Sequence, residues 1–123
     1  MKVVAAIIIK KNKYFIAQRN KNKHLGLKWE FPGGKVDVNE SLEEALKREI
    51  REELNIEIAI IKKIVKKNYK DEKINIKVYY FECYHISGSF LLNEHEDSKW
   101  ISKNEMHNYD FVQADSKVFK YLL

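Results

Sequence analysis

The sequence predicts an α/β or α+β domain with a mixed β-sheet and helices packed against it. Apolar runs rich in Val and Ile recur along the chain and are typical of buried strands. Between them lies one segment with the start and stop signals of a helix, and a second helical pattern ends the chain. The length of 123 residues suits one core, so we expect a single domain over residues 1–123.

The first part of the chain predicts a hairpin followed by a loop and a turn. Residues 3–9 are a continuous apolar run, and residues 14–18 predict the returning strand, because the polar turn 11–13 separates the two. Residues 20–28 are polar and predict a loop. Residues 29–34 hold the only proline and two of the four glycines, which favours a sharp turn.

The clearest helix is expected over Ser41–Leu54. Ser41 and Glu44 match the capping box that begins a helix, and Asn55 can adopt the left-handed conformation that ends one. The rest of the chain predicts strands at 56–65, 74–83 and 85–91, a short strand near Trp100, and a terminal helix over 114–123 with Val118, Phe119 and Leu122 inward.

Composition and charge exclude several protein classes. No apolar run is long enough to span a membrane, and no leader pattern follows Met1. The single cysteine, Cys83, excludes an internal disulfide and favours a core position and a reduced, cytoplasmic setting. The net charge of +5 suggests an anionic partner, against the simpler interpretation of a lysine-rich solvated surface.

The charge is unevenly distributed. Residues 40–57 carry a net charge of −4, so the remainder carries +9. An acidic cluster inside a basic protein suggests a cation site within a polyanion site. Only three of the 23 basic residues are arginines (Arg19, Arg48 and Arg51), and each is a candidate for planar, bidentate binding that lysine cannot provide.

The predicted helix places acids where its apolar face should be. At about 100° per residue, the apolar residues of its first turns define an inward arc. Three carboxylates occupy or border that arc: Glu49, Glu52 and Glu53. Buried carboxylates repel one another, and Mg²⁺, which prefers carboxylate and phosphate oxygens, would relieve the repulsion. Arg48 can orient Glu52 by an i,i+4 contact, and the alternative is that Glu52 and Glu53 are solvated on a helix flank.

The same helix lies inside a longer pattern over residues 34–56. Gly34 is followed after five residues by Glu40 and, after seven more, by Arg48-Glu49-Ile50-Arg51-Glu52-Glu53-Leu54-Asn55-Ile56. This resembles the Nudix box, G-x5-E-x7-R-E-U-x-E-E-x-G-U with U aliphatic. The one departure is Asn55 in place of the last glycine, and asparagine is the next-best residue for a positive φ.

The resemblance implies an α/β/α sandwich and a hydrolase of nucleoside diphosphates linked to another group. It implies Mg²⁺ as the cofactor, with Mn²⁺ as an alternative. Carried onto this sequence, the metal would be held by Glu49, Glu52, Glu53 and the Gly33 carbonyl. Arg48 would orient the carboxylates, Glu40 would have a supporting electrostatic role, and Glu49 and Glu53 would be catalytic.

Further residues resemble the MutT-type branch of that family. They are Arg19, the run Trp29–Lys35, Glu94 six residues before Trp100, and Ala114-Asp115. The resemblance implies that Glu94 completes the metal site and competes with Glu49 as the general base. It also implies substrate binding by Arg19, Phe31, Lys35 and Asp115.

Each of these roles has a structural alternative. Arg19 and Lys35 could be solvated charges, Phe31 a core residue, and Asp115 the N-cap of the terminal helix. Glu94 could be one more acid of an acidic loop. The run Lys62–Lys70 suggests a solvated face or an RNA-binding surface.

We therefore expect a Mg²⁺-dependent pyrophosphohydrolase of nucleoside triphosphates, with 8-oxo-dGTP, CTP, dCTP and 5-methyl-dCTP as candidate substrates. The branch implies roles in sanitising the nucleotide pool and in DNA repair. The alternatives are an RNA 5′-pyrophosphohydrolase and a non-catalytic nucleotide sensor. The sequence specifies neither the oligomeric state nor the number of metals.

Overall fold

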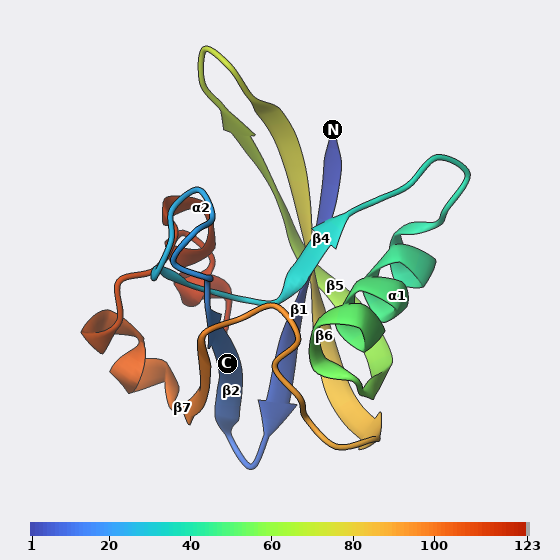
Figure 1. Ribbon diagram of the computed structural model, residues 1–123, viewed down its shortest axis with the longest axis vertical. Coiled ribbons are helices and arrows are strands. Elements are labelled where there is room, and N and C mark those ends of the chain that lie inside the picture. Colours follow the sequence, from blue (N-terminus) through green and yellow to red (C-terminus); the bar gives the residue numbers. More distant parts are fainter. Residues whose placement is uncertain (123) are drawn as a thin grey trace.

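The computed structural model describes residues 1–122, and Leu123, the last residue of the predicted terminal helix, lies outside the described residues. Figure 1 shows a central sheet with α1 on one side and the C-terminal helical segment on the other. The elements in chain order are β1 (Lys2–Lys10), β2 (Lys13–Gln18), β3 (Trp29–Glu30), β4 (Gly33–Lys35), α1 (Leu42–Leu54), β5 (Glu57–Lys70), β6 (Asn75–Ser87), β7 (Asp97–Ile101), η1 (Lys103–Asn108), α2 (Gln113–Ser116) and η2 (Phe119–Tyr121).

The sheet is mixed, as expected. Its main order is β3-β2-β1-β6-β5, with β4 paired to β1 and β7 to β2. β1 runs parallel to β6, whereas β1–β2, β1–β4, β2–β7 and β5–β6 are antiparallel. The first half of β1 pairs with both β4 and β6, and residues of all three strands line one cavity.

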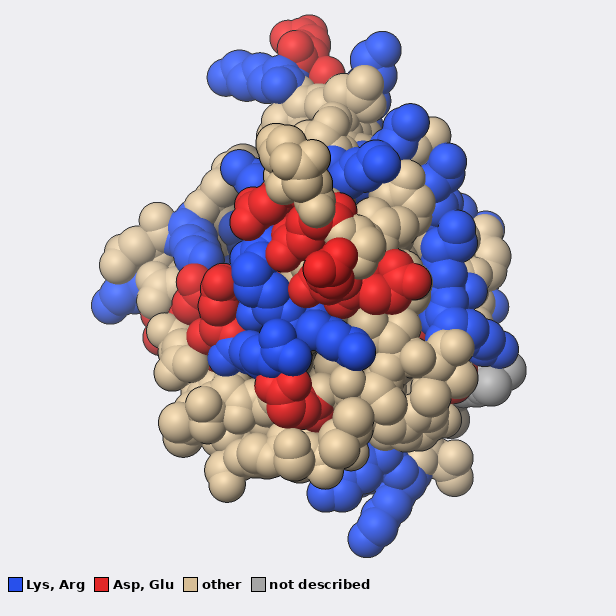
Figure 2. All heavy atoms as spheres, turned by 90° about the vertical axis from the view of Figure 1, so that its right-hand side faces the viewer, with Lys and Arg blue, Asp and Glu red and all other residues tan. Residues whose placement is uncertain are grey.

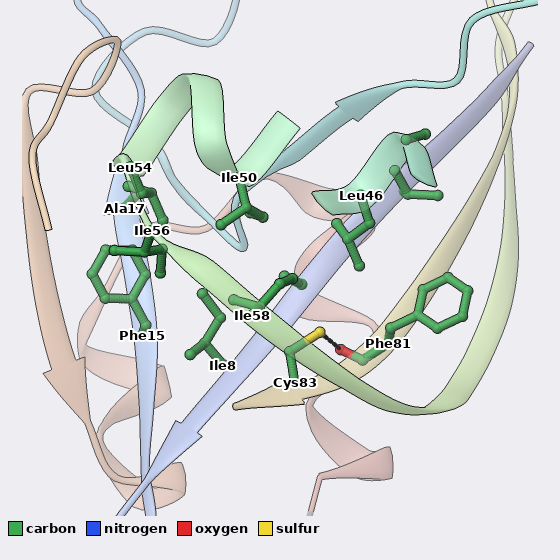
Figure 3. Close-up of a cluster of buried hydrophobic side chains, with 13 residues drawn as sticks. Ile8, Phe15, Ala17, Leu46, Ile50, Leu54, Ile56, Ile58, Phe81 and Cys83 are labelled. Atoms are coloured by element: carbon green, nitrogen blue, oxygen red, sulfur yellow. Dashed lines mark hydrogen bonds between the residues drawn. The ribbon is translucent and has the colours of Figure 1, made fainter. Parts of the chain in front are cut away.

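The two faces of β1 build two separate cores. Alternate side chains of a strand point to opposite faces of a sheet. Accordingly Val4, Ala6 and Ile8 pack under α1, whereas Ala5 and Ile7 pack under the C-terminal segment. Figure 3 shows Leu46, Ile50 and Leu54 of α1 directed at the sheet around Ile8 and Ile58, with Cys83 buried in the same core. This confirms the sandwich.

The helix α1 begins and ends as its sequence predicts. Ser41 is the N-cap, and its side chain and that of Glu44 form both hydrogen bonds of the capping box. Asn55 adopts φ 60° and ψ 33°, the left-handed conformation, so it performs the role of the missing glycine. The helix is thereby fixed at both ends, which holds the carboxylates along it in a defined register.

Three predicted elements are wrong in detail. Residues 29–34 are not a turn alone, because they contain the whole of the short strand β3 and the beginning of β4. No separate strand covers 85–91: His85–Ser87 extend β6, and Gly88, with φ 90°, turns the chain into a loop. Periodicity could not distinguish one long strand from two.

The predicted terminal helix 114–123 is also wrong as a continuous element. Only Gln113–Ser116 are α-helical, and the 3₁₀ turn Phe119–Tyr121 follows. Val118 and Leu122 are nevertheless buried and Phe119 packs against the same core, as the pattern predicts. Phe119 and Leu122 are three residues apart, and residues at that spacing lie on one side of a 3₁₀ turn as well as of an α-helix.

The lysine run Lys62–Lys70 lies on β5, at an edge of the sheet. Charged side chains on an edge strand oppose pairing with a second sheet, and most of these lysines are exposed. Figure 2 shows Lys and Arg side chains in a band along one edge of the face that also carries acidic side chains. In the described part of the chain, no helix is long and apolar enough to cross a bilayer.

Candidate active site

A cavity of about 520 Å³ lies where β1, β4, α1 and the loop after β6 meet. Its lining includes eight residues that the sequence nominates: Arg19, Phe31, Gly33, Lys35, Glu49, Glu53, Glu94 and Asp115. Two other predicted residues, Arg48 and Glu52, lie outside the lining. The fold thus brings together side chains from four separate parts of the chain.

The acids of α1 divide between the cavity and the solvent. Glu53 is buried, with 3% of the residue exposed, and Glu49 lines the cavity one turn earlier. The side chain of Glu52 is 56% exposed and makes only a long contact of 3.4 Å with Arg48. The expected inward arc therefore holds for Glu49 and Glu53, while Glu52 lies on the solvated flank.

Glu53 is electrostatically unsatisfied. Its Oε2 is buried without a hydrogen-bond partner among the described residues. Burial, the hydrogen bond with Glu49 and the negative charges of Glu49, Glu30 and Glu94 all raise the pKa of Glu53. A buried anion with this surrounding is costly unless a cation joins it.

Arg48 holds the other carboxylates in place from outside the cavity. Its Nε and Nη2 donate to both oxygens of Glu40, at 2.7 and 3.0 Å, and its Nη1 donates to Glu49 at 2.9 Å. Nη2 also donates to the carbonyl oxygen of Lys35 at 3.0 Å, which ties α1 to β4. The Arg48 hydrogen bonds lower the pKa of Glu40. The main partners of Arg48 are therefore Glu40 and Glu49 rather than Glu52, the contact that the sequence suggests.

The two glycines of β4 are required by close packing. A Cβ on Gly34 would overlap the carboxylate of Glu49, and a Cβ on Gly33 would overlap the backbone oxygen of Val4. Gly34 therefore makes room for a functional side chain, whereas Gly33 allows β4 to approach β1.

Glu94 lies on the loop between β6 and β7, and its neighbours are anchored on both sides. The Asn93 amide donates to the Glu53 carbonyl oxygen at 3.0 Å, and the Glu96 amide donates to the Gln18 carbonyl oxygen at 2.9 Å. The side chain of Asn93 also donates to the Glu52 carbonyl oxygen at 2.9 Å. An exposed residue is thereby held at the mouth of the cavity.

Arg19 is paired before any substrate binds. Its Nη1 donates to Glu30 Oε1 at 2.8 Å and its Nε donates to the His24 carbonyl oxygen at 2.9 Å. Glu30 Oε2 lies 2.9 Å from His95 Nε2. Burial opposes ionisation of Glu30, but its hydrogen bonds with His95 and Arg19 outweigh that effect and lower its pKa.

The far side of the cavity has a different chemistry. Asp115 is buried; its Oδ2 accepts from the Phe31 amide at 2.9 Å and its Oδ1 accepts from the Tyr80 hydroxyl at 2.6 Å. Burial raises the pKa of Asp115 to about 7. The alternative role as an N-cap is wrong, because Val112 holds that position and Asp115 binds Phe31 instead. Phe31 is a core residue that also contributes to the lining of the cavity.

Sequence reasoning missed Glu30, His95 and Tyr80. Glu30 lies inside the run Trp29–Lys35, and His95 directly follows Glu94. The motifs therefore pointed to these parts of the sequence but did not predict which contacts the two residues make. Tyr80 follows the alternation of β6 and could be recognised only as a core residue.

The residues at the acidic end fit a divalent cation. They offer hard carboxylate oxygens, and the orphaned Oε2 of Glu53 lacks the partner that a cation would supply. Within residues 1–122, no three His, Cys, Asp or Glu side chains already form a group that could hold an ion in their present positions. A divalent cation at this end would therefore need a change in the side-chain positions of the acids that line the cavity.

Comparison with known proteins identifies the family of the chain. The model of the NUDIX domain matches residues 1–122. An 8-oxo-dGTP diphosphatase from Buchnera aphidicola is 36% identical over 116 residues, which cover 94% of this chain and 88% of that protein.

Solved structures share the fold. The solution structure of the E. coli ORF135 protein is 32% identical, covers 98% of this chain and 86% of that one, and has a TM-score of 0.85. The DNA mismatch repair protein MutT of Staphylococcus aureus 252 is 34% identical, covers 98% and 93%, and has a TM-score of 0.79. The chain therefore belongs to the Nudix family, in its MutT-like group, and is a hydrolase of phosphoric anhydride bonds.

Proposed function

We propose that the protein is a Mg²⁺-dependent nucleoside triphosphate pyrophosphohydrolase that releases a nucleoside monophosphate and pyrophosphate. One observation carries the proposal: a single cavity has an acidic end at Glu49 and Glu53, where Glu53 Oε2 lacks a partner among the described residues, and a hydrogen-bonding end where the Phe31 amide donates to Asp115. A nucleotide has two matching parts: a polyphosphate that binds divalent cations and a base that forms hydrogen bonds.

The acidic end would hold Mg²⁺, with Mn²⁺ as the alternative. Glu49, Glu53 and Glu94 are the side-chain ligands that line the cavity, with the Gly33 carbonyl as a further ligand. Glu52 would have to turn inward from the solvated flank to join them. A bound divalent cation would neutralise the charge that develops on the phosphate oxygens.

The protein's own residues would bind and orient the triphosphate. Arg19 is held by Glu30, so its guanidinium is presented at the cavity wall, and Lys35 adds a second cation at the same cavity. Either Glu49 or Glu94 would accept the proton of the water that attacks the β-phosphorus. Glu49 is oriented by Arg48, while Glu94 is held by its anchored loop.

Among nucleotides, 8-oxo-dGTP is the leading candidate substrate because the 36% identical relative bears that activity in its name. CTP, dCTP and 5-methyl-dCTP are the alternatives. Asp115 favours a base that presents hydrogen-bond donors, because a carboxylate only accepts while ionised. The Phe31 amide and the Tyr80 hydroxyl already use one direction on each of its oxygens.

The test is a nucleotide panel with Mg²⁺ in which pyrophosphate and orthophosphate are measured separately. We expect pyrophosphate as the product and one nucleotide of the panel to be hydrolysed fastest. Glu72→Gln is the matched control for later acid variants, because Glu72 is an exposed acid at the tip of the β5–β6 hairpin. Orthophosphate as the sole product would reject attack at the β-phosphorus.

A second candidate function is removal of pyrophosphate from RNA 5′ ends, and the basic surface on β5 supports it. Lys63 and Lys67 lie over the rings of Tyr79 and Tyr121, at 5.7 and 4.9 Å. A second hollow of about 510 Å³ beside Phe119 has Lys67, Lys103, Lys117 and Lys120 in its lining.

Hydrolysis of a triphosphorylated RNA tests this second function. The rate of RNA hydrolysis should fall steeply as the salt concentration rises. It should also fall in the double variant Lys117→Gln, Lys120→Gln, while the rate of nucleoside triphosphate hydrolysis stays unchanged. Failure to release pyrophosphate from RNA would reject it.

A further inference from the structure

Glu30 contacts two parts of the site that lie on separate elements of the chain. Arg19 follows β2, Glu30 ends β3, and His95 lies on the loop between β6 and β7. One carboxylate oxygen of Glu30 pairs with Arg19 at 2.8 Å, and the other lies 2.9 Å from His95 Nε2. All three residues line the cavity.

The contacts of Glu30 are sheltered from water. The Glu30 side chain is 16% exposed and that of His95 is 4% exposed. A hydrogen bond between a carboxylate and a charged or polar partner is strong when water is excluded, and it also fixes direction. The network is therefore rigid enough to set the position of the groups attached to it.

Each end of the network leads to a residue with a proposed role. Arg19 is the proposed phosphate ligand, and His95 is the residue next to Glu94. His95 Nε2 also lies 3.8 Å from Glu53 Oε1, so the imidazole stands between the loop and α1. The backbone anchors at Asn93 and Glu96 hold the loop from either side, and His95 is the side-chain anchor between them.

We propose that Glu30 is a positioning residue that couples Arg19 to the Glu94 loop through His95. The inference rests on the proposed function, in which Arg19 binds phosphate and Glu94 serves the reaction. In this role Glu30 acts through Arg19 and His95 rather than on the substrate directly. It places the phosphate ligand and the loop acid in one fixed relation, so that a bound triphosphate is aligned with the reacting groups.

Steady-state kinetics of three variants test the coupling. His95→Leu keeps bulk but removes the hydrogen bond, so we expect kcat to fall about 10-fold with KM nearly unchanged. Arg19→Lys keeps the charge but loses the planar fork, so we expect KM to rise about 10-fold with a small change in kcat. Glu30→Gln should change both, because it weakens both bonds at once.

The double variant of Glu30 and His95 shows whether the two residues act through each other or affect the rate independently. If Glu30 acts on the loop through His95, kcat of Glu30→Gln with His95→Leu should equal that of Glu30→Gln alone. His95→Gln, whose amide can donate to Glu30, should recover most of the loss. Multiplicative losses and no recovery by glutamine would overturn the proposal.

The controls are an exposed acid and an exposed histidine. Glu72→Gln and His107→Leu change the same residue types away from the cavity, at exposed positions. Both should retain wild-type kcat and KM. A role of Glu30 in stability alone would lower the melting temperature of Glu30→Gln while its kcat and KM per folded molecule stayed at the wild-type values, and this result would also overturn the proposal.

Hydrogen–deuterium exchange of residues 88–96 tests the same coupling without any substrate. The amides of Asn93 and Glu96 are hydrogen-bonded, so loosening the loop should speed their exchange about 10-fold or more in Glu30→Gln and His95→Leu, but not in Arg19→Lys. Unchanged exchange in both loop variants would overturn the coupling. If the wild-type protein hydrolyses no nucleotide, the proposed function fails on its own, and this measurement still decides the positioning role.

Discussion

The cavity contains two buried acids, and they differ in how their oxygens are satisfied. Asp115 accepts hydrogen bonds on both oxygens, from the Phe31 amide and the Tyr80 hydroxyl. Glu53 has an oxygen without a partner and faces Glu49, Glu30 and Glu94. Both are almost wholly buried, with residue exposures of 6% and 3%.

This difference shows what each end of the cavity needs. Asp115 is complete within the protein, so it can present a fixed pattern of acceptors to a neutral group such as a base. Glu53 has an unpartnered oxygen and a raised pKa, so its ionised form becomes stable only when a cation compensates for the charge. The cavity is thus preorganised at the Asp115 end, where we propose that the base binds. It has an unsatisfied carboxyl group at the Glu53 end, where we propose that a cation and the phosphates bind, so function there is expected to cost stability.

The largest expected effect is that of Glu53→Gln. We expect kcat/KM to fall about 10³-fold or more, equivalent to about 4 kcal/mol of transition-state stabilisation. Measured pyrophosphate release checks it, with Glu72→Gln as the matched control. Activity within a factor of ten of wild type would remove Glu53 from the catalytic site.

The next effect concerns the glycines of β4. Gly34→Ala should lower activity about 10- to 100-fold with a small change in melting temperature, because the added methyl group displaces the Glu49 carboxylate. Gly33→Ala should mainly destabilise the fold, because its methyl group meets the backbone of β1. Activity assays and thermal unfolding of both variants check this contrast, and equal effects on the two readouts would contradict it.

The sequence predicted much of this arrangement because local rules govern it. The cap residues Ser41 and Asn55 determined both ends of α1, and the spacing along the helix placed Glu49 and Glu53 on one side. The apolar pattern of Val118, Phe119 and Leu122 did not distinguish an α-helix from a 3₁₀ turn. The partnership of Glu30 with His95 joins residues 65 positions apart and leaves no periodic signal.

A smaller effect is expected for Glu52→Gln than for Glu53→Gln. The Glu52 side chain is 56% exposed, so water already solvates its charge and only inward rotation would bring it to a cation. We expect kcat to fall about 10-fold, as for a residue that supports a metal site rather than forming its core. Parallel assays at saturating Mg²⁺ check the order, and a larger loss at Glu52 would show that it is the principal ligand.

The smallest effect on rate is expected for Asp115→Asn, which should instead change the order of preferred nucleotides. The amide adds donors where the ionised carboxylate only accepts. We expect less than about a 10-fold loss on the best substrate, in line with the modest energy of one neutral hydrogen bond. An unchanged ranking across the nucleotide panel would place Asp115 outside base recognition.

The same variant tests the buried charge. The folded protein holds the Asp115 proton up to a pKa of about 7, whereas an unfolded chain releases it near pH 4. The stability contributed by this group is therefore complete below about pH 4 and is lost as the pH rises toward 7. The melting temperature of Asp115→Asn relative to wild type should rise over that interval, and a constant difference would contradict the assignment.

The most direct test of the contrast between the two acids is thermal unfolding of wild type and Glu53→Gln with and without Mg²⁺. Without the metal, the variant should be more stable by about 1 to 3 kcal/mol, because an uncharged amide that can donate to Glu49 replaces a buried carboxyl group whose Oε2 has no partner among the described residues. With Mg²⁺, the melting temperature of wild type should rise while that of the variant hardly changes. A variant that is less stable without metal and responds to Mg²⁺ as wild type does would contradict the account.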